Sequence, residues 1–221
     1  MARVREVIRV RQAAGGWTHP VTIVAVTKTH GPEAVRAAAA AGLTDIGENR
    51  VQEALAKQEA LGPVPVDWHL VGTLQRNKAR HAVGRFALIH SVDRLELAGE
   101  LQRRLPDGAR QAVLVQVNCS GEPQKGGTEP HELLGLLAAM AQLDRLEVRG
   151  LMTMTALTDD EGEQRRTFVR LRELREAARR EGHRVNELSM GMSGDFGAAV
   201  EEGATIVRLG TVLFGERAYE R

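Results

Sequence analysis

The chain has 221 residues, of which 43% are apolar, so it is long enough to bury one sizeable core. Its 30 basic and 29 acidic residues give a formal net charge of +1, and only 3% of residues are aromatic. We therefore expect neither nucleic acid nor a membrane as partner, since no overall field attracts them and base-stacking residues are scarce. Cys119 is the single cysteine, which excludes an internal disulfide and a multi-thiolate metal site.

The opening segment, residues 1–17, reads MARVREVIRVRQAAGGW and interrupts its apolar residues with arginines. It therefore lacks the continuous apolar stretch of a signal peptide or a membrane span. Val4, Val7 and Ile8 predict an amphipathic helix that docks under the main fold, with an arginine-rich transit peptide as the alternative. Together with the lone cysteine, this pattern leads us to expect a cytoplasmic protein.

Eight short apolar runs predict eight β-strands. The first, VTIVAVTK at residues 21–28, is a continuous β-branched run, which suits a strand covered on both faces in a parallel sheet. The other seven runs are residues 44–49, 66–72, 86–92, 112–118, 147–154, 186–191 and 205–210.

Helical patterns with start and stop signals separate these runs. The helix predicted at 32–42 opens on Pro32, and the helix predicted at 158–182 opens on a Thr158–Glu161 capping box. Eight strands alternating with eight helices predict an α/β fold, a single (β/α)8 TIM barrel with an extra N-terminal helix, in one domain over residues 1–221. An open, doubly wound sheet is the alternative, separated from the barrel only by its number of strands.

The chemistry of such a barrel gathers at the carboxyl ends of its strands. Lys28 is the predicted strand-end side chain that becomes a nucleophile by losing a proton. The pKa of a free lysine is about 10.4, so an uncharged amine at pH 7 costs roughly 4–5 kcal/mol. Burial and a neighbouring Arg208 would supply part of this free energy. The alternative is a strand-end lysine that simply extends into water.

Two glycine-containing loops approach Lys28 if the barrel closes, because strand eight then lies beside strand one. They are LSMGMSGDFG at residues 188–197 and VRLGTVLFG at residues 207–215. Their backbone N–H groups predict an anion site at helix N-termini, with simple helix capping as the alternative for each loop. A phosphate cradle beside a strand-end lysine fits a phosphorylated aldehyde. The residues that form this cradle are Ser193, Gly194, Gly210 and Thr211.

Seven motifs in chain order resemble one known family. They are AVTKTH, GENRVQEA, WHLVGTLQRNK, VNCSGEPQKGG, RGLMTM, LSMGMSGDF and VRLGTVLFGER, and they extend from about Val21 to Arg217. The chain is thereby identified as similar to the single-domain pyridoxal phosphate homeostasis proteins of the YggS/PROSC type. This resemblance implies a barrel like the N-terminal domain of alanine racemase, with pyridoxal 5'-phosphate (PLP) bound as a Schiff base on Lys28.

The resemblance also implies roles for further residues. Arg208 would face the pyridine nitrogen of PLP, and His69 would be a neighbour of the site unless it is a buried core histidine. Arg50 stands where the family often has an aromatic residue, and Gly194 and Gly197 replace bulkier or acidic residues, so we expect a looser rim. The phosphate would be held by Ser193, Gly210 and Thr211, and the ring would be lined by Asn49 and Met152.

These residues favour a carrier over an enzyme, with no catalytic residue assigned. An arginine at the pyridine nitrogen keeps it unprotonated and weakens the electron sink of the cofactor. A two-base racemase needs a second acid/base, yet the only tyrosine is Tyr219, and Cys119 is better explained as a small buried residue. We expect a PLP homeostasis and delivery protein. The alternatives are a weak PLP-dependent amino-acid racemase and a Schiff-base aldolase on a sugar phosphate.

The remaining predictions concern partners. We expect a monomer that makes transient contact with apo PLP-dependent enzymes. Lys125 in the GEPQKGG loop is either a second, transient imine site or a solvated loop lysine. Asp45, Glu48 and Asp67 have no metal-ligand spacing with the histidines, so no metal is predicted.

Overall fold

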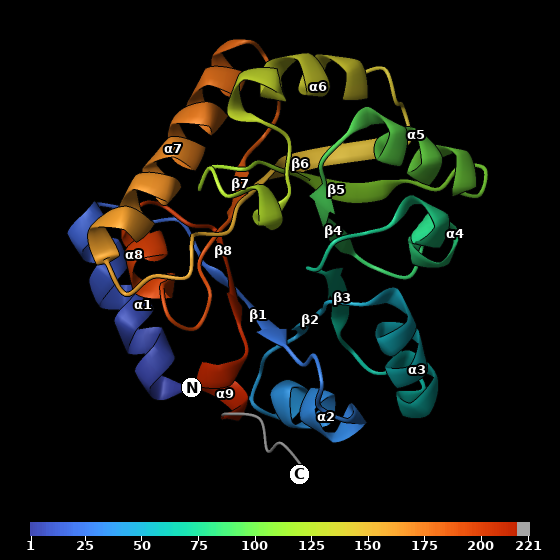
Figure 1. Ribbon diagram of the computed structural model, residues 1–221. Helices are drawn as coiled ribbons and strands as arrows, with labels where there is room; N and C mark the ends of the chain where they lie inside the picture. The colour runs from blue at the N-terminus through green and yellow to red at the C-terminus, as the bar shows by residue number, and fades with distance from the viewer. Residues whose placement is uncertain (216–221) are drawn as a thin grey trace.

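The computed structural model, which describes residues 1–215, is a closed parallel barrel with the strand order β1 to β8 (Figure 1). Pairing of β1 with β8 closes the ring, which confirms the predicted barrel and excludes the open sheet. The strands are β1 (Thr22–Val26), β2 (Asp45–Glu48), β3 (Asp67–Leu70), β4 (Leu88–Val92), β5 (Gln111–Gln116), β6 (Leu146–Met152), β7 (Glu187–Ser189) and β8 (Ile206–Leu209).

A helix follows every strand and covers the outside of the ring, as Figure 1 shows in the view along the barrel. The α-helices are α1 (Ala2–Gly15), α2 (Pro32–Ala40), α3 (Val51–Leu61), α4 (Ala79–Ala82), α5 (Leu95–Arg104), α6 (Leu133–Met140), α7 (Glu161–Arg180), α8 (Phe196–Glu201) and α9 (Thr211–Phe214). Three short 3-10 helices are η1 (Arg76–Lys78), η2 (Pro123–Lys125) and η3 (Pro130–Glu132).

Side chains of each strand alternate between the barrel interior and the layer under the helices, because successive residues of a strand point to opposite faces. The apolar part of the interior is a compact cluster of buried residues, Val24, Val26, Val71, Leu88, Ala112, Leu114, Met152 and Ile206. A much larger buried cluster fills the layer between strands and helices. Polar residues occupy the rest of the interior, and several of them form hydrogen bonds with residues of the site.

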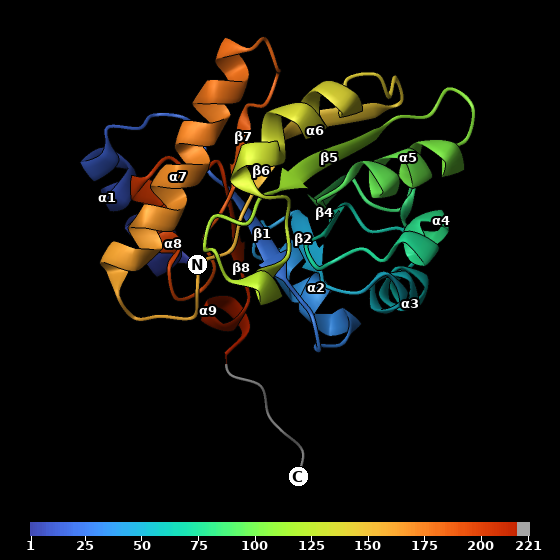
Figure 2. The same cartoon turned by 45° about the horizontal axis from the view of Figure 1, so that its top comes forward.

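The predicted N-terminal helix is α1, which buries Val4 and Ile8. It packs against α8 at the side of the barrel, next to α7 (Figure 2). The indole Nε1 of Trp17 donates to the carbonyl of Glu201 at 2.8 Å, which fastens the end of this helix to α8.

The predicted Thr158–Glu161 capping box is wrong in its position. The N-cap of α7 is Asp160, whose carboxylate accepts from the N–H groups of Gly162 and Glu163. Thr158 instead accepts from the N–H of Asp160. An aspartate at the cap is favoured because its charge also interacts with the positive end of the helix dipole.

No helix within residues 1–215 is both long enough and apolar enough to cross a lipid bilayer.

Candidate functional site

A pocket of about 400 Å³ opens at the carboxyl ends of the strands, a size typical of small-molecule sites. The end of the barrel on which it lies is where TIM-barrel chemistry is found. Six of the seven residues predicted for the site line this pocket: Lys28, Asn49, Ser193, Arg208, Gly210 and Thr211.

Lys28 lies half-buried in the turn that leaves β1, and both of its neighbours are fixed to α3. The carbonyl of Thr27 accepts from Lys57 Nζ at 2.7 Å, and the N–H of Thr29 donates to Glu53 Oε1 at 2.6 Å. Thr29 has φ of 67°, and within residues 1–215 it is the non-glycine residue with a positive φ. Such backbone strain in a β-branched residue persists only where the surroundings impose it, so this turn is rigidly held.

Arg208 is buried in β8 and projects to the floor of the pocket. Its Nη1 donates to Ser189 Oγ at 2.7 Å, and its Nη2 donates to the carbonyl of Thr153 at 2.9 Å. Burial lowers the pKa of the guanidinium to about 10, although the charge of Asp195 opposes this shift. Arg208 is therefore still a cation at neutral pH, and its orientation is fixed by neighbours on β7 and after β6.

The loops after β7 and β8 meet at Ser193. Its Oγ accepts from the N–H groups of Gly210 and Val212, both at 3.2 Å, which joins the two loops at the start of α9. A Cβ on Gly210 would lie 3.3 Å from the carbonyl of Val26, so glycine permits the close approach of this loop to β1. Converging N–H and hydroxyl groups of this kind suit an oxyanion.

Asn49 follows β2 and reaches the pocket wall beside Gly72, which follows β3. A Cβ on Gly72 would lie 2.3 Å from the carbonyl oxygen of Asn49, which no side chain can tolerate. Ser91 Oγ donates to the carbonyl of Gly72 at 2.7 Å and holds this contact from the next strand. The position of Asn49 therefore depends on a glycine one strand away.

Comparison with known proteins shows the family. The family model for the alanine racemase N-terminal domain matches residues 3–218. A pyridoxal phosphate homeostasis protein of Aquifex aeolicus (strain VF5) is 44% identical over 222 residues, which cover 99% of this chain and 97% of the relative. The corresponding protein of Pseudomonas aeruginosa is 46% identical over 219 residues, covering 99% and 93%. This chain belongs to the pyridoxal phosphate homeostasis protein family.

A solved structure supports the same assignment. PipY of Synechococcus elongatus PCC7942, in a structure with PLP bound, is 41% identical to this chain and superposes on it with a TM-score of 0.82. The match covers 94% of this chain and 100% of PipY. The resemblance inferred from the seven motifs is therefore confirmed.

The seventh predicted residue of this family member, Met152, lies below the pocket and does not line it. It is fully buried in the apolar interior cluster, and Met154 lines the pocket wall instead. Strand β6 ends at Met152. The next side chain on the same face is that of Met154, two residues further along and just beyond the end of the strand. The sequence motif RGLMTM contains both methionines and does not decide between them.

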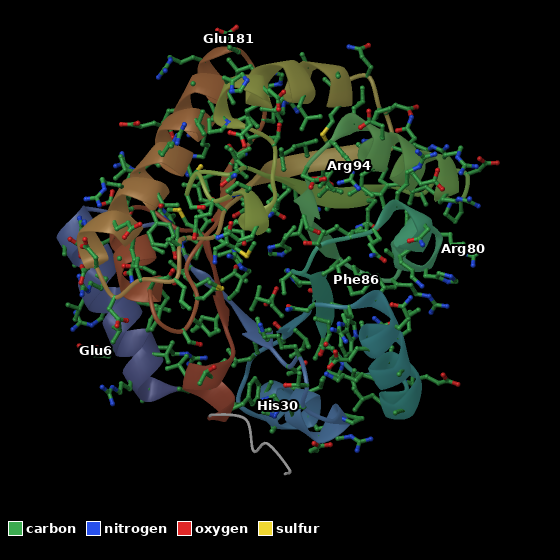
Figure 3. All side chains as sticks on the ribbon, viewed as in Figure 1. Glu6, His30, Arg80, Phe86, Arg94 and Glu181 are labelled. Carbon is green, nitrogen blue, oxygen red and sulfur yellow. The ribbon has the colours of Figure 1, made fainter. Side chains whose placement is uncertain are left out.

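Sequence reasoning also missed other residues of the pocket wall, among them the polar side chains His30 and Gln116. The His30 ring lies 5.3 Å from the Phe214 ring, so the turn after β1 contacts α9, and Figure 3 labels it in this part of the ring. Gln116 Nε2 donates to the carbonyl of Lys125 at 2.8 Å and ties the β5 loop to the pocket. The TKTH motif and the inward alternation along β5 are the signals that point to them.

The remaining expectations, on two glycines, the cysteine and the tyrosine, have different outcomes. A Cβ on Gly194 would meet no atom within 4 Å, so this part of the rim is open as expected. Gly197 does not belong to the rim, because it faces Arg11 and Val7 of α1. Cys119 is 5% exposed and burial raises the pKa of its thiol to about 11, which makes it a neutral core residue. Tyr219 lies outside the described residues.

The other polar groups near the barrel pair with one another. Within residues 1–215, no three His, Cys, Asp or Glu side chains come together as metal ligands would. Asp45 contacts His69, and Glu48 contacts Lys57, so both carboxylates have protein partners.

Proposed function

We propose that this chain binds PLP in the pocket at the carboxyl end of the barrel and captures its aldehyde as a Schiff base on Lys28. The cofactor supplies a reactive carbonyl that an amine attacks reversibly. The donors present around the pocket fit the parts of this molecule. Lys28 supplies the amine, and the loops that meet at Ser193 supply the hydroxyl groups of Ser193 and Thr211 for a phosphate. The relatives named for PLP homeostasis and the PLP-bound PipY support this ligand.

The observation that carries the proposal is the buried, fixed guanidinium of Arg208 at the pocket floor. A guanidinium donates hydrogen bonds and accepts none, so a ring nitrogen that faces it must be an unprotonated acceptor. An unprotonated pyridine nitrogen withdraws electrons weakly from bound amino-acid carbons. We infer that the protein holds and delivers PLP, with little or no catalysis.

The surroundings of the pocket support delivery. Thr29, Met192, Gly194 and Thr211 on its rim are exposed, so water and acceptor amines reach the ligand. An enzyme that stabilises a carbanion usually excludes water from the reacting atoms. An accessible imine instead exchanges readily with a second amine, as a carrier requires.

The proposal extends to where and with what this protein acts. We place PLP homeostasis in the cytoplasm, to which a lone, buried thiol is suited, with transient contacts to apo PLP-dependent enzymes. We propose a monomer because the exposed large apolar side chains of residues 1–215 are scattered over separate elements: Val10, Leu95, Leu134, Leu157, Met192 and Val212. Analytical ultracentrifugation of the holo-protein tests this: a sedimentation mass of about one chain is expected, and a stable dimer would contradict it.

Absorbance, borohydride trapping and peptide mapping test the site. Wild-type protein loaded with PLP should show an imine band that borohydride removes, with the label on Lys28. Lys28→Arg should lose the band and the label, because a guanidinium is not a nucleophile at neutral pH. Lys78→Arg, which changes a lysine of η1 outside the pocket, should keep both. Labelling of Lys57, Lys78 or Lys125 with Lys28 unlabelled would overturn the assignment.

A weak racemase is the second candidate, and His30 is the observation that favours it. Among the described pocket-lining residues, His30 is the titratable side chain other than Lys28 and Arg208. It could serve as a second acid/base. Incubation of the holo-protein with single L-amino acids, followed by chiral analysis, should give no sustained D-isomer. Multiple turnovers that are abolished in His30→Gln would instead establish the racemase.

A further inference from the structure

A continuous chain of polar side chains crosses the barrel interior and ends at Arg208. Arg208 Nη1 lies 2.7 Å from Ser189 Oγ, which lies 2.9 Å from His90 Nδ1. His90 Nε2 lies 3.0 Å from His69 Nδ1, and His69 Nε2 lies 3.2 Å from Asp45 Oδ1. Five residues from β8, β7, β4, β3 and β2 are thus in contact one after another.

The chain runs from one end of the barrel to the other. Arg208 lies at the floor of the ligand pocket at the carboxyl end, whereas Asp45 begins β2 at the amino end. The Asp45 side chain is 27% exposed and lines a separate surface cleft beside Arg5 and Ile8. His90 and Ser189 between them are fully buried. Solvent at one end is therefore connected through hydrogen-bonding groups to the ligand pocket at the other.

The two ends of the chain fix its direction. A carboxylate can only accept, so His69 presents a protonated Nε2 to Asp45, and in the neutral ring its Nδ1 is then an acceptor that faces His90. His90 then donates from Nε2, which leaves its Nδ1 as an acceptor for the Ser189 hydroxyl hydrogen. The Ser189 oxygen in turn accepts from Arg208, which can only donate. All four contacts can thus be hydrogen bonds that point the same way, from the cation to the carboxylate.

Burial supports the neutral histidine that this arrangement needs. Desolvation is the main cause that lowers the pKa of His90 well below its usual range, and the positive charge of Arg208 lowers it further. A neutral His90 has one donor and one acceptor nitrogen, which is what a one-way chain requires. Aligned hydrogen bonds in a medium of low dielectric polarise and strengthen one another.

We propose that Asp45, His69, His90 and Ser189 are positioning residues for Arg208, and that their one-way chain sets how the guanidinium meets the ring of the bound ligand. This inference rests on the proposed function, in which that ring belongs to PLP. One N–H of Nη1 donates to Ser189 and one N–H of Nη2 donates to the carbonyl of Thr153. The plane of the guanidinium is therefore fixed from two sides. The remaining N–H groups stay available to the pocket. His69 and His90 then have a positioning role in addition to packing in the core, because they connect the carboxylate of Asp45 to the guanidinium of Arg208.

Nitrogen NMR of the histidine rings tests the direction without any ligand. In ligand-free wild-type protein labelled with 15N-histidine, His69 and His90 should both be neutral and should carry the proton on Nε2. Assignment uses His69→Gln and His90→Gln. A proton on Nδ1 of His90 would show that the one-way chain of hydrogen bonds does not exist, whether or not the proposed function is correct.

Substitution of Asp45, the solvent-exposed end of the hydrogen-bond chain, tests whether the chain affects ligand binding. Asp45→Asn removes the terminal charge far from the pocket and should weaken PLP binding by roughly threefold to tenfold, about the net value of one hydrogen bond. The absorption maximum of the bound cofactor should move. Asp45→Glu, which keeps the carboxylate, should restore both. Asp67→Asn is the matched control, because Asp67 is the register partner of Asp45 at the start of β3 and takes no part in the chain.

The urea concentration at the midpoint of unfolding is measured for each variant. It distinguishes a loss of stability from a loss of Arg208 positioning. A merely structural role for Asp45 would change the midpoint and leave the absorption maximum of bound PLP unchanged, and that result would overturn the inference. An unchanged affinity and spectrum in Asp45→Asn would overturn it as well. If the wild type binds no PLP, the proposed function fails, and the NMR measurement still decides whether the one-way chain exists.

Discussion

Lys57 Nζ lies 2.6 Å from Glu48 Oε1 in the layer between the barrel and α3, and both side chains are buried. The same ammonium group donates to the carbonyl of Thr27 and contacts Glu53, which in turn accepts from the N–H of Thr29. The residues on each side of Lys28 are therefore held by one buried ion cluster. Lys57, which does not line the pocket, thus positions Lys28, which does.

Lys57→Met should destabilise the protein by about 3–5 kcal/mol, because it leaves a buried carboxylate without its partner. Burial already raises the pKa of Glu48 above its usual value, although Lys57 and Thr27 oppose this, so Glu48 should take up a proton in the variant. Urea denaturation measures the loss, and PLP affinity should fall because the turn of Lys28 loses a support. Lys78→Met on η1 is the control and should change stability little; an equal loss there would contradict the explanation.

Thr29→Gly should release strain in the turn that carries Lys28. A β-branched residue in the left-handed region costs about 1–2 kcal/mol, of which the entropy of glycine in the unfolded chain offsets roughly 0.5–1 kcal/mol. We expect a free energy of unfolding that rises by up to about 1 kcal/mol, with weaker PLP binding because the turn is less constrained. Thr29→Ala removes the side chain without releasing φ, and it should not show this gain.

Gly72→Ala should abolish PLP binding and destabilise the fold by several kcal/mol. The new Cβ would lie 2.3 Å from the carbonyl oxygen of Asn49, so the loop after β2 would have to move away from the pocket. The matched substitution is Gly99→Ala in α5, where a Cβ meets no atom within 4 Å. This control should raise stability by up to about 1 kcal/mol, because glycine is unfavourable in a helix. Normal PLP binding by Gly72→Ala would show that Asn49 is not held in this way.

Cys119 should make the protein sensitive to alkaline pH. Burial raises the pKa of its thiol from 9.0 to about 11, so between these values the unfolded chain loses a proton that the folded chain keeps. Stability from this group is complete below pH 9 and is lost as the pH rises toward 11, by about 2–3 kcal/mol. Unfolding free energies measured from pH 8 to 11 should fall more steeply in wild type than in Cys119→Ala. Parallel curves would contradict this assignment.

The sequence alone was sufficient for the barrel and for most of the pocket. Continuous β-branched runs such as residues 21–28 suit only strands that are buried on both faces, and the alternation with helices then fixes a parallel arrangement. Once the barrel is closed, strand-end residues share one end. This is why Lys28 and the loops after strands seven and eight could be assigned to one site from the sequence, whereas Asn49 and the role of Arg208 were assigned through the family resemblance.

The structure differs from the sequence-based expectation where a shift of two residues along the chain decides the outcome. Met152 and Met154 have the same side-chain character, and only the end of β6 determines which of them reaches the pocket. Thr158 and Asp160 are both good caps, and the charge of Asp160 prevails at α7. Gly197 follows the site loop in sequence but turns toward α1. Sequence patterns have a precision of a few residues, which is too coarse for these choices.

Local sequence therefore determined which residues form strands, which loops carry glycine and hydroxyl groups, and which lysine stands at a strand end. Only the tertiary structure decided how side chains from distant strands meet. Asp45, His69, His90, Ser189 and Arg208 lie far apart in the sequence, and nothing in their local patterns links them. Barrel closure brings them together, because inward-facing residues of different strands share one interior in which every buried polar group needs a partner.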